Sequence, residues 1–81
     1  MRIHVHFYAQ LRDVAGVSDL SLELPEDSSV ADVLEELYRL KPMLGAHDKN
    51  ILIGTGVDFV GRDHLLTEGE DLAIMPPVQG G

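Results

Sequence analysis

Hydrophobic and polar residues alternate strictly over residues 2–8 of the chain. A period of two is typical of a β-strand that buries one face and exposes the other. Residues 20–24 alternate in the same way and stop at Pro25, so they predict a second strand. Between these runs, residues 9–15 predict a short helical turn that ends at Gly16. The two strands are expected to pair as an antiparallel hairpin.

The longest helical pattern covers residues 30–41, where apolar residues recur at intervals of three and four. Ser29 and Asp32 form the two halves of a capping box at its start, with Asp in place of the more usual Glu. Pro42 is expected to end the helix, because proline cannot continue the helical hydrogen bonds. The predicted apolar face consists of Val30, Val33, Leu34, Leu37 and Leu40.

The second half of the chain contains shorter apolar runs. Residues 43–50 predict a loop or a broken turn. Three further strands are predicted at residues 51–53, 57–60 and 71–75. Gly54 and Gly56 indicate a bulge or a tight turn between the first two of these strands.

This order of elements places one amphipathic helix beside a sheet of mixed direction. The predicted fold class is therefore α+β: a β-grasp (ubiquitin-like) fold, in which one main helix packs on one face of a mixed sheet. A chain of 81 residues suffices for one domain of this kind. We expect the domain to occupy residues 1–75, followed by a flexible tail at residues 76–81. Its free energy of unfolding is expected to be about 4–12 kcal/mol.

The charge and composition of the chain limit its partners and location. Fourteen acidic and six basic side chains give a formal net charge of −8, which opposes binding to nucleic acid or an anionic membrane and favours basic partner surfaces. No cysteine is present, so the chain can form neither a disulfide nor a persulfide. No apolar stretch has the form of a membrane span or a signal peptide, so a cytoplasmic location is expected.

The end of the chain combines two conformationally restricted prolines with two glycines that have no side chain. Pro76 and Pro77 fix φ and donate no amide hydrogen bond, so they hold the start of the tail extended. Gly80 and Gly81 lack Cβ atoms, so the terminal carboxylate can enter a cleft too narrow for any other residue. Six extended residues reach about 20 Å. The tail therefore indicates a terminus that is delivered into the active site of a partner.

Three segments carry a resemblance to one protein family: residues 7–16, residues 66–74 and the Pro-Pro-Val-Gln-Gly-Gly ending at residues 76–81. They are similar to the small subunits of molybdopterin synthase, the MoaD group of the MoaD/ThiS ubiquitin-like sulfur carriers. The similarity extends from the first strand to the last residue. The family often has an Asn-containing hairpin where this chain has Thr55-Gly56, so the local turn and its partner contacts are expected to differ.

The resemblance implies a non-catalytic sulfur-donor subunit. In the family, a MoeB-like adenylating enzyme uses ATP to convert the terminal carboxylate, here that of Gly81, to an acyl-adenylate. A sulfur donor system then replaces AMP to leave a thiocarboxylate. Within a complex with the large, MoaE-like subunit, the thiocarboxylate supplies sulfur for the dithiolene of molybdopterin. No bound cofactor is implied for the chain, and the catalytic side chains are expected on its partners.

Two alternatives share the activated terminus. One is a sulfur carrier for another pathway, such as thiamine thiazole synthesis, although such carriers are typically shorter and lack a segment like residues 41–50. The other is a ubiquitin-like protein modifier, which would join Gly81 to lysines of target proteins through isopeptide bonds.

The resemblance and the strand pattern together predict a docking surface. Tyr8 and Met75 fall on the sheet face opposite the buried residues, so they are expected to be exposed although largely apolar. Phe59 corresponds to a family position at the interface with the large subunit. The predicted partner-binding residues are Tyr8, Phe59, Met75, Pro76, Pro77, Val78, Gln79 and Gly80.

Other candidate chemistry in the sequence is weak. His4 and His6 share one strand face and could bind a metal ion, but the sequence shows no third ligand, so no metal site is predicted. Ser28 and Ser29 fit turn and cap chemistry better than nucleophilic catalysis.

Overall fold

The computed structural model describes residues 1–56 and 58–77. The predictions that concern Val57, Val78, Gln79, Gly80 and Gly81 lie outside the described residues. The elements follow one another as β1 (Arg2–Phe7), α1 (Gln10–Ala15), β2 (Asp19–Glu23), α2 (Val30–Leu40), α3 (Pro42–Gly45), the 3-10 helix η1 (Asp48–Asn50), β3 (Leu52–Thr55), β4 (Asp58–Val60) and β5 (Asp71–Met75).

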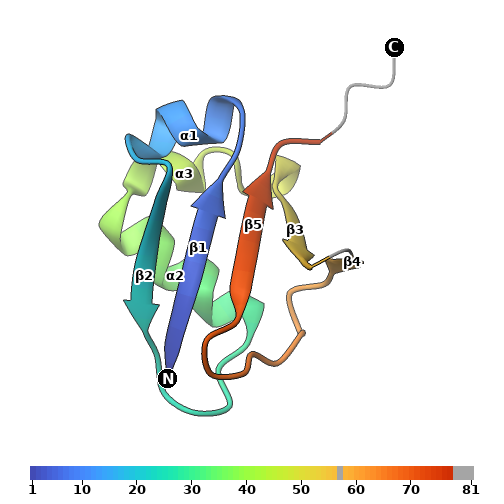
Figure 1. Cartoon of the computed structure of the whole chain (residues 1–81). Coiled ribbons are helices and arrows are strands. Elements are labelled where there is room, and N and C mark those ends of the chain that lie inside the picture. Colours follow the sequence, from blue (N-terminus) through green and yellow to red (C-terminus); the bar gives the residue numbers. More distant parts are fainter. Residues whose placement is uncertain (57, 78–81) are drawn as a thin grey trace.

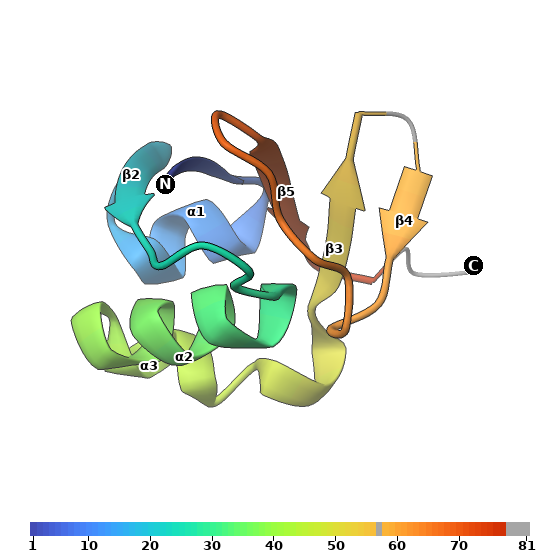
Figure 2. The ribbon, with the colours of Figure 1, turned by 90° about the horizontal axis from the view of Figure 1, so that it is seen from below.

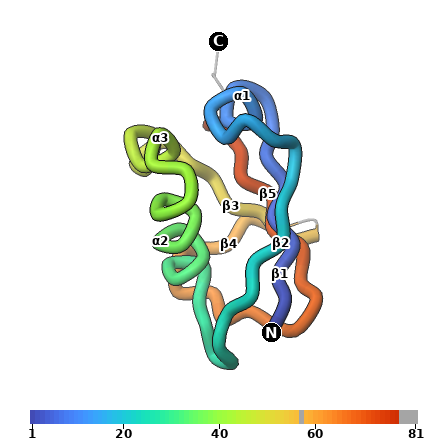
Figure 3. The backbone as a smooth tube through the Cα atoms, turned by 90° about the vertical axis from the view of Figure 1, so that its left-hand side faces the viewer, coloured from blue at the N-terminus to red at the C-terminus, as the bar shows by residue number. Residues whose placement is uncertain are grey.

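The described strands form one mixed sheet in the order β2-β1-β5-β3-β4 (Figure 1). β1 and β5 run parallel at its centre, whereas the other neighbouring pairs are antiparallel. Figure 3 shows α2 and α3 on one side of the sheet and α1 at the end where β1 stops. This arrangement confirms the predicted β-grasp fold with one main helix on one face.

The predicted hairpin of the first two strands is also confirmed. β1 pairs antiparallel with β2, and Ile3 lies opposite Leu22. The connection between them contains α1, as the sequence indicated. Gly16 ends α1 with a φ of 80°, a left-handed conformation that glycine adopts without steric cost.

The capping box starts α2 as predicted. The Ser29 hydroxyl accepts a hydrogen bond from the Asp32 amide, and the Asp32 carboxylate accepts one from the Ser29 amide at 2.8 Å. Leu40 was predicted to share the buried face of the helix, but 44% of it is exposed. It is the last residue of α2, where the chain turns away into α3. The buried residues of the helix are Val30, Val33, Leu34 and Leu37.

Residues 43–50 were predicted to form a loop or a broken turn, and the structure has two short helical turns there instead of a loop. Pro42 starts α3 as well as ending α2, because proline fits the first helical position, where the amide has no partner within the helix. η1 then follows, and its Asp48 carboxylate accepts hydrogen bonds from the Tyr38 hydroxyl at 2.5 Å and from Arg62 at 2.7 Å. These bonds tie the connection to α2 and to the segment after β4.

The hydrophobic core lies between α2 and the sheet, and Figure 2 shows these two layers from below. Alternate residues of the two central strands point into it, and their chain neighbours point to the open face. No helix in residues 1–56 and 58–77 is long and apolar enough to cross a membrane. The largest fully buried side chains are those of Ile3, Val5, Leu11, Val30, Val33, Leu37, Leu44, Leu72 and Ile74.

Candidate functional site

A shallow hollow lies on the open face of the sheet, over β5, β3 and β4. Gly54 and Ala73 form its floor, because both are small and they pair opposite each other in β3 and β5. Tyr8, Phe59 and Met75 line it as well. Its volume of about 270 Å³ suits a side chain of a partner better than a cofactor.

Strand pairing brings these residues together from distant parts of the chain. Phe59 in β4 pairs opposite Gly54, which pairs on its other side with Ala73 in β5. The Tyr8 amide donates a hydrogen bond to the Ile74 carbonyl at 3.1 Å, which fixes Tyr8 beside the end of β5. The structure therefore gathers the predicted residues Tyr8, Phe59 and Met75 around one hollow.

The absence of a side chain at Gly54 shapes the floor of the hollow. A Cβ atom at this position would come within 3.0 Å of Met75 Cε and 3.8 Å of Ala73 Cβ. The tight turn predicted at Gly54 and Gly56 lies at Gly56, whereas Gly54 pairs regularly within β3. Its small size serves the close approach of Met75 instead.

The turn from β3 to β4 depends on Gly56. Its φ is 55°, and Thr55 and Asp58 pair across the turn. Glycine readily adopts a left-handed φ, so Gly56 fits this backbone conformation without steric cost.

The hollow exposes large apolar groups to solvent. Phe59 is 67% exposed and Tyr8 is 50% exposed. Met75 is only half-buried, with its side chain against Gly54. The predicted exposure of Tyr8 is confirmed, whereas Met75 is more covered than predicted. Exposed aromatic residues grouped at one hollow are typical of a protein-binding surface.

The base of the tail lies beside Tyr8. β1 and β5 run parallel and end side by side (Figure 1), so Tyr8, the residue after β1, and Pro76, the residue after β5, leave the same end of the two strands. Both Pro76 and Pro77 are half-buried. A small hollow at this edge is lined by Gln10, Leu11, His47, Asn50, Pro76 and Pro77.

Carboxylates border the hollow over β5, β3 and β4. Asp58 lies on its rim, and an adjoining hollow that shares Tyr8 and Ala73 adds Asp71 and His6. These acidic groups and the net charge of −8 favour a partner surface with basic groups around an apolar side chain.

Glu70 holds the segment that leads into β5. Its carboxylate lies 2.9 Å from the His64 imidazole and accepts a hydrogen bond from the Thr67 amide at 2.9 Å. Burial alone raises the pKa of Glu70, but the hydrogen bonds from His64 and Thr67 outweigh it and hold that pKa below its usual value.

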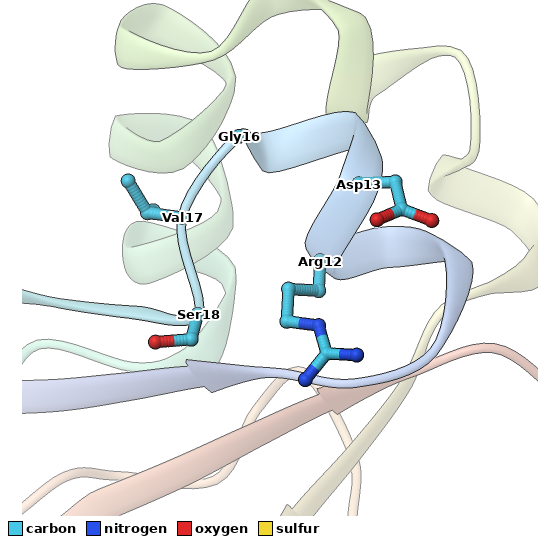
Figure 4. A pocket seen from close by; sticks show the side chains of 5 residues that line it. All are labelled: Arg12, Asp13, Gly16, Val17 and Ser18. Carbon is cyan, nitrogen blue, oxygen red and sulfur yellow. The ribbon is translucent and has the colours of Figure 1, made fainter.

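Another surface hollow lies beside the end of α1, where Arg12, Asp13, Gly16, Val17 and Ser18 line it (Figure 4). The polar ends of Arg12, Asp13 and Ser18 point in different directions in Figure 4. A ligand site requires polar groups that converge on one point, so this hollow does not resemble one.

Residues 5–81 match the model of the ThiS family. The chain belongs to the ThiS family. It is similar to the molybdopterin synthase sulfur carrier subunit of Chlamydomonas reinhardtii, with 30% identity over 83 residues that cover 100% of both chains.

Two solved structures place this ThiS-family chain among β-grasp proteins. One is the putative molybdopterin converting factor, subunit 1, of Pyrococcus furiosus. It superposes with a TM-score of 0.88 and 27% sequence identity, and the match covers 96% of this chain and 99% of that one. The other is the small archaeal modifier protein 1 of Methanosarcina acetivorans. It superposes with a TM-score of 0.80 and 28% sequence identity, and the match covers 99% of this chain and 96% of that one.

The residues that line the hollow pair no nucleophile with a base. Three of these lining residues were predicted from the sequence: Tyr8, Phe59 and Met75. The other four were not: Gly54, Gly56, Asp58 and Ala73. Gly54 gave a signal, since an isolated glycine in a strand pattern indicates a close approach of another group, but that signal was assigned to the turn.

Proposed function

We propose that this ThiS-family chain is the sulfur carrier subunit of a molybdopterin synthase, with Gly81 as the carrier residue, and that it acts in the cytoplasm. The observation that carries the proposal is the similarity, over the whole of both chains, to a sulfur carrier subunit of that enzyme. The diglycine ending and the absence of cysteine support it, because sulfur must then be held on the terminal carboxylate.

The chemistry explains why the carrier needs an activating partner. A carboxylate resists attack by a nucleophile because of its charge and poor leaving group. In the proposed sequence, a MoeB-like enzyme transfers AMP from ATP to the Gly81 carboxylate and releases pyrophosphate. Hydrosulfide supplied by a sulfur donor then attacks the acyl carbon and expels AMP, which leaves the thiocarboxylate.

The described surface supports a role in delivering that terminus. The large, MoaE-like subunit would insert a side chain into the hollow formed by Tyr8, Phe59 and Met75. Pro76 and Pro77 would hold the start of the tail extended where it leaves the end of β5, so that Gly80 and Gly81 could enter the partner's active site. The terminal glycines would leave the acyl carbon unhindered.

The proposal is tested by reconstitution with an adenylating enzyme, ATP, a sulfur donor, the large subunit and the pterin precursor. Deletion of Gly81 should abolish sulfur transfer without shifting the unfolding midpoint. Gly80→Val should slow transfer, because a β-branched side chain restricts entry into a narrow channel. Full activity of the chain without Gly81 would refute the proposal.

A second candidate is a protein modifier, favoured by the similarity to a small archaeal modifier protein. It would use the same activated Gly81 but transfer the acyl group to lysine amines. Mass spectrometry of host lysate separates the two: lysine residues joined to the C-terminal peptide that ends at Gly81 support modification, and their absence together with activity in the synthase assay supports the sulfur carrier.

A further inference from the structure

We infer that the open face of the sheet holds a binding site for a divalent transition metal ion of the Zn²⁺ type, formed by His4, His6 and Asp19. The site is separate from the activated terminus and does not depend on the proposed function. The sequence offered only the two histidines. The structure supplies the third ligand from a different strand, since one potential ligand atom from each of the three residues lies within 4.8 Å of the others.

The register of the sheet creates this cluster. His4 and His6 are two residues apart in β1, so both point to the open face, and their ring centroids are 4.3 Å apart. Asp19 starts β2 directly opposite His6, yet its carboxylate Oδ1 reaches to 3.6 Å from Nε2 of His4. Ligand atoms in a tetrahedral zinc site are about 3.3 Å apart, so small side-chain rotations suffice to close the set around an ion.

Asp71 is placed to orient both imidazoles. It starts β5 directly opposite His4. Its Oδ1 lies 3.3 Å from Nδ1 of His4 and 3.1 Å from Nε2 of His6. One nitrogen of each ring therefore faces Asp71, and the other nitrogen of each ring remains for the metal. A carboxylate that holds the far nitrogen of a ligating histidine is a recurrent feature of metal sites, where it fixes the ring and its tautomer.

The donor set selects the class of ion. Imidazole nitrogen with carboxylate oxygen suits Zn²⁺ and related transition metals, whereas Mg²⁺ and Ca²⁺ prefer oxygen ligands alone. Within the described residues, histidines are the only basic groups within ion-pair distance of Asp19 and Asp71. Three protein ligands on an accessible surface leave a fourth position for water or for a group of another molecule.

The test is a zinc titration of the full chain without a histidine tag, in competition with a chromophoric chelator. Wild type should bind one Zn²⁺ per chain, and excess Mg²⁺ should not displace it. His4→Gln and Asp19→Asn should each weaken binding at least about tenfold, and Asp71→Asn should weaken it to a smaller extent. His47→Gln, a matched change in η1 outside the cluster, should leave the affinity within about twofold of wild type.

Absence of saturable binding would overturn the inference, and so would displacement by Mg²⁺ or an equal loss in His47→Gln. The metal-free unfolding midpoint of each variant checks that the fold is intact, as expected for the side chains of His4, Asp19 and Asp71, which are 41%, 49% and 66% exposed. Co²⁺ bound to wild type gives a second readout independent of the variants: a strong visible absorption band indicates four-coordinate nitrogen and oxygen ligation, and a weak octahedral spectrum contradicts the proposed set.

Discussion

On one face of the sheet, Val5 and Ile74 are fully buried beneath α2, while on the other face their chain neighbours His6 and Met75 border an open surface. The two faces come from alternate residues of the same strands. The covered face holds the hydrophobic contacts that stabilise the fold. The open face contributes little to the core, so its residues are available for partners and ions. Substitutions on the two faces should therefore separate stability from binding.

The largest expected effect on stability comes from the covered face. Leu37→Ala in α2 should lower the free energy of unfolding by about 2–5 kcal/mol, because it leaves a cavity at a fully buried position. Leu40→Ala is the matched control in the same helix: Leu40 is 44% exposed, so its loss should be well below half as large. Urea denaturation measures both. Equal losses would contradict the assignment of the core face.

On the open face, Phe59→Asp should weaken binding to the large subunit by about 30-fold or more, because it places a charge where an aromatic anchor is expected. Its unfolding midpoint should stay near that of wild type. Met43→Asp on α3 is the matched control, since Met43 is 68% exposed and Phe59 67%. Isothermal titration calorimetry distinguishes them. The same affinity for both variants would remove Phe59 from the docking surface.

Gly54→Ala tests whether the shape of the hollow matters for binding, because it alters that shape without a change of charge. The new methyl group would meet the end of the Met75 side chain at 3.0 Å, and that end is flexible enough to move. The free energy of unfolding should change by less than about 1 kcal/mol. The affinity for the large subunit should decrease by about threefold to tenfold. Gly45→Ala, which would make only ordinary contacts with Tyr38, should leave the affinity unchanged.

The smallest expected effect is the acid dependence due to Glu70. Hydrogen bonds hold its pKa in the folded chain below the unfolded value of about 4.3. Its contribution to stability is therefore complete above that value and is lost as the pH falls through the folded pKa. Glu70→Gln should flatten the stability profile below about pH 5, and His64→Gln should do so in part. Unfolding midpoints measured across this range that show no change in either variant would contradict this role.

Much of the fold could be predicted because local patterns specify it. The period of two in β1 and β5 and the capping box at Ser29 gave those elements and their buried faces correctly. The helix at Pro42 was missed because the same residue both ends one helix and begins the next. Leu40 was assigned to the core because periodicity does not show where a helix leaves the sheet.

The open face could be predicted only in part. The alternation of side chains along the first and last strands placed Tyr8 and Met75 on the open face, and the family resemblance added Phe59. The hollow also needs the order of the strands, which puts Ala73 between β1 and β3. The third ligand of the histidine cluster needs the register of β1 and β2, which brings Asp19 to His4. Neither order nor register follows from local sequence patterns.

Whether Gly81 carries sulfur is decided by the intact mass of the protein purified from its native host. Replacement of one carboxylate oxygen by sulfur adds about 16 Da. We expect a fraction of the chains to show this gain in the C-terminal peptide. Treatment with an alkylating agent should convert that fraction to the alkylated thiocarboxylate. A population entirely at the unmodified mass, from cells that are making molybdopterin, would contradict this expectation.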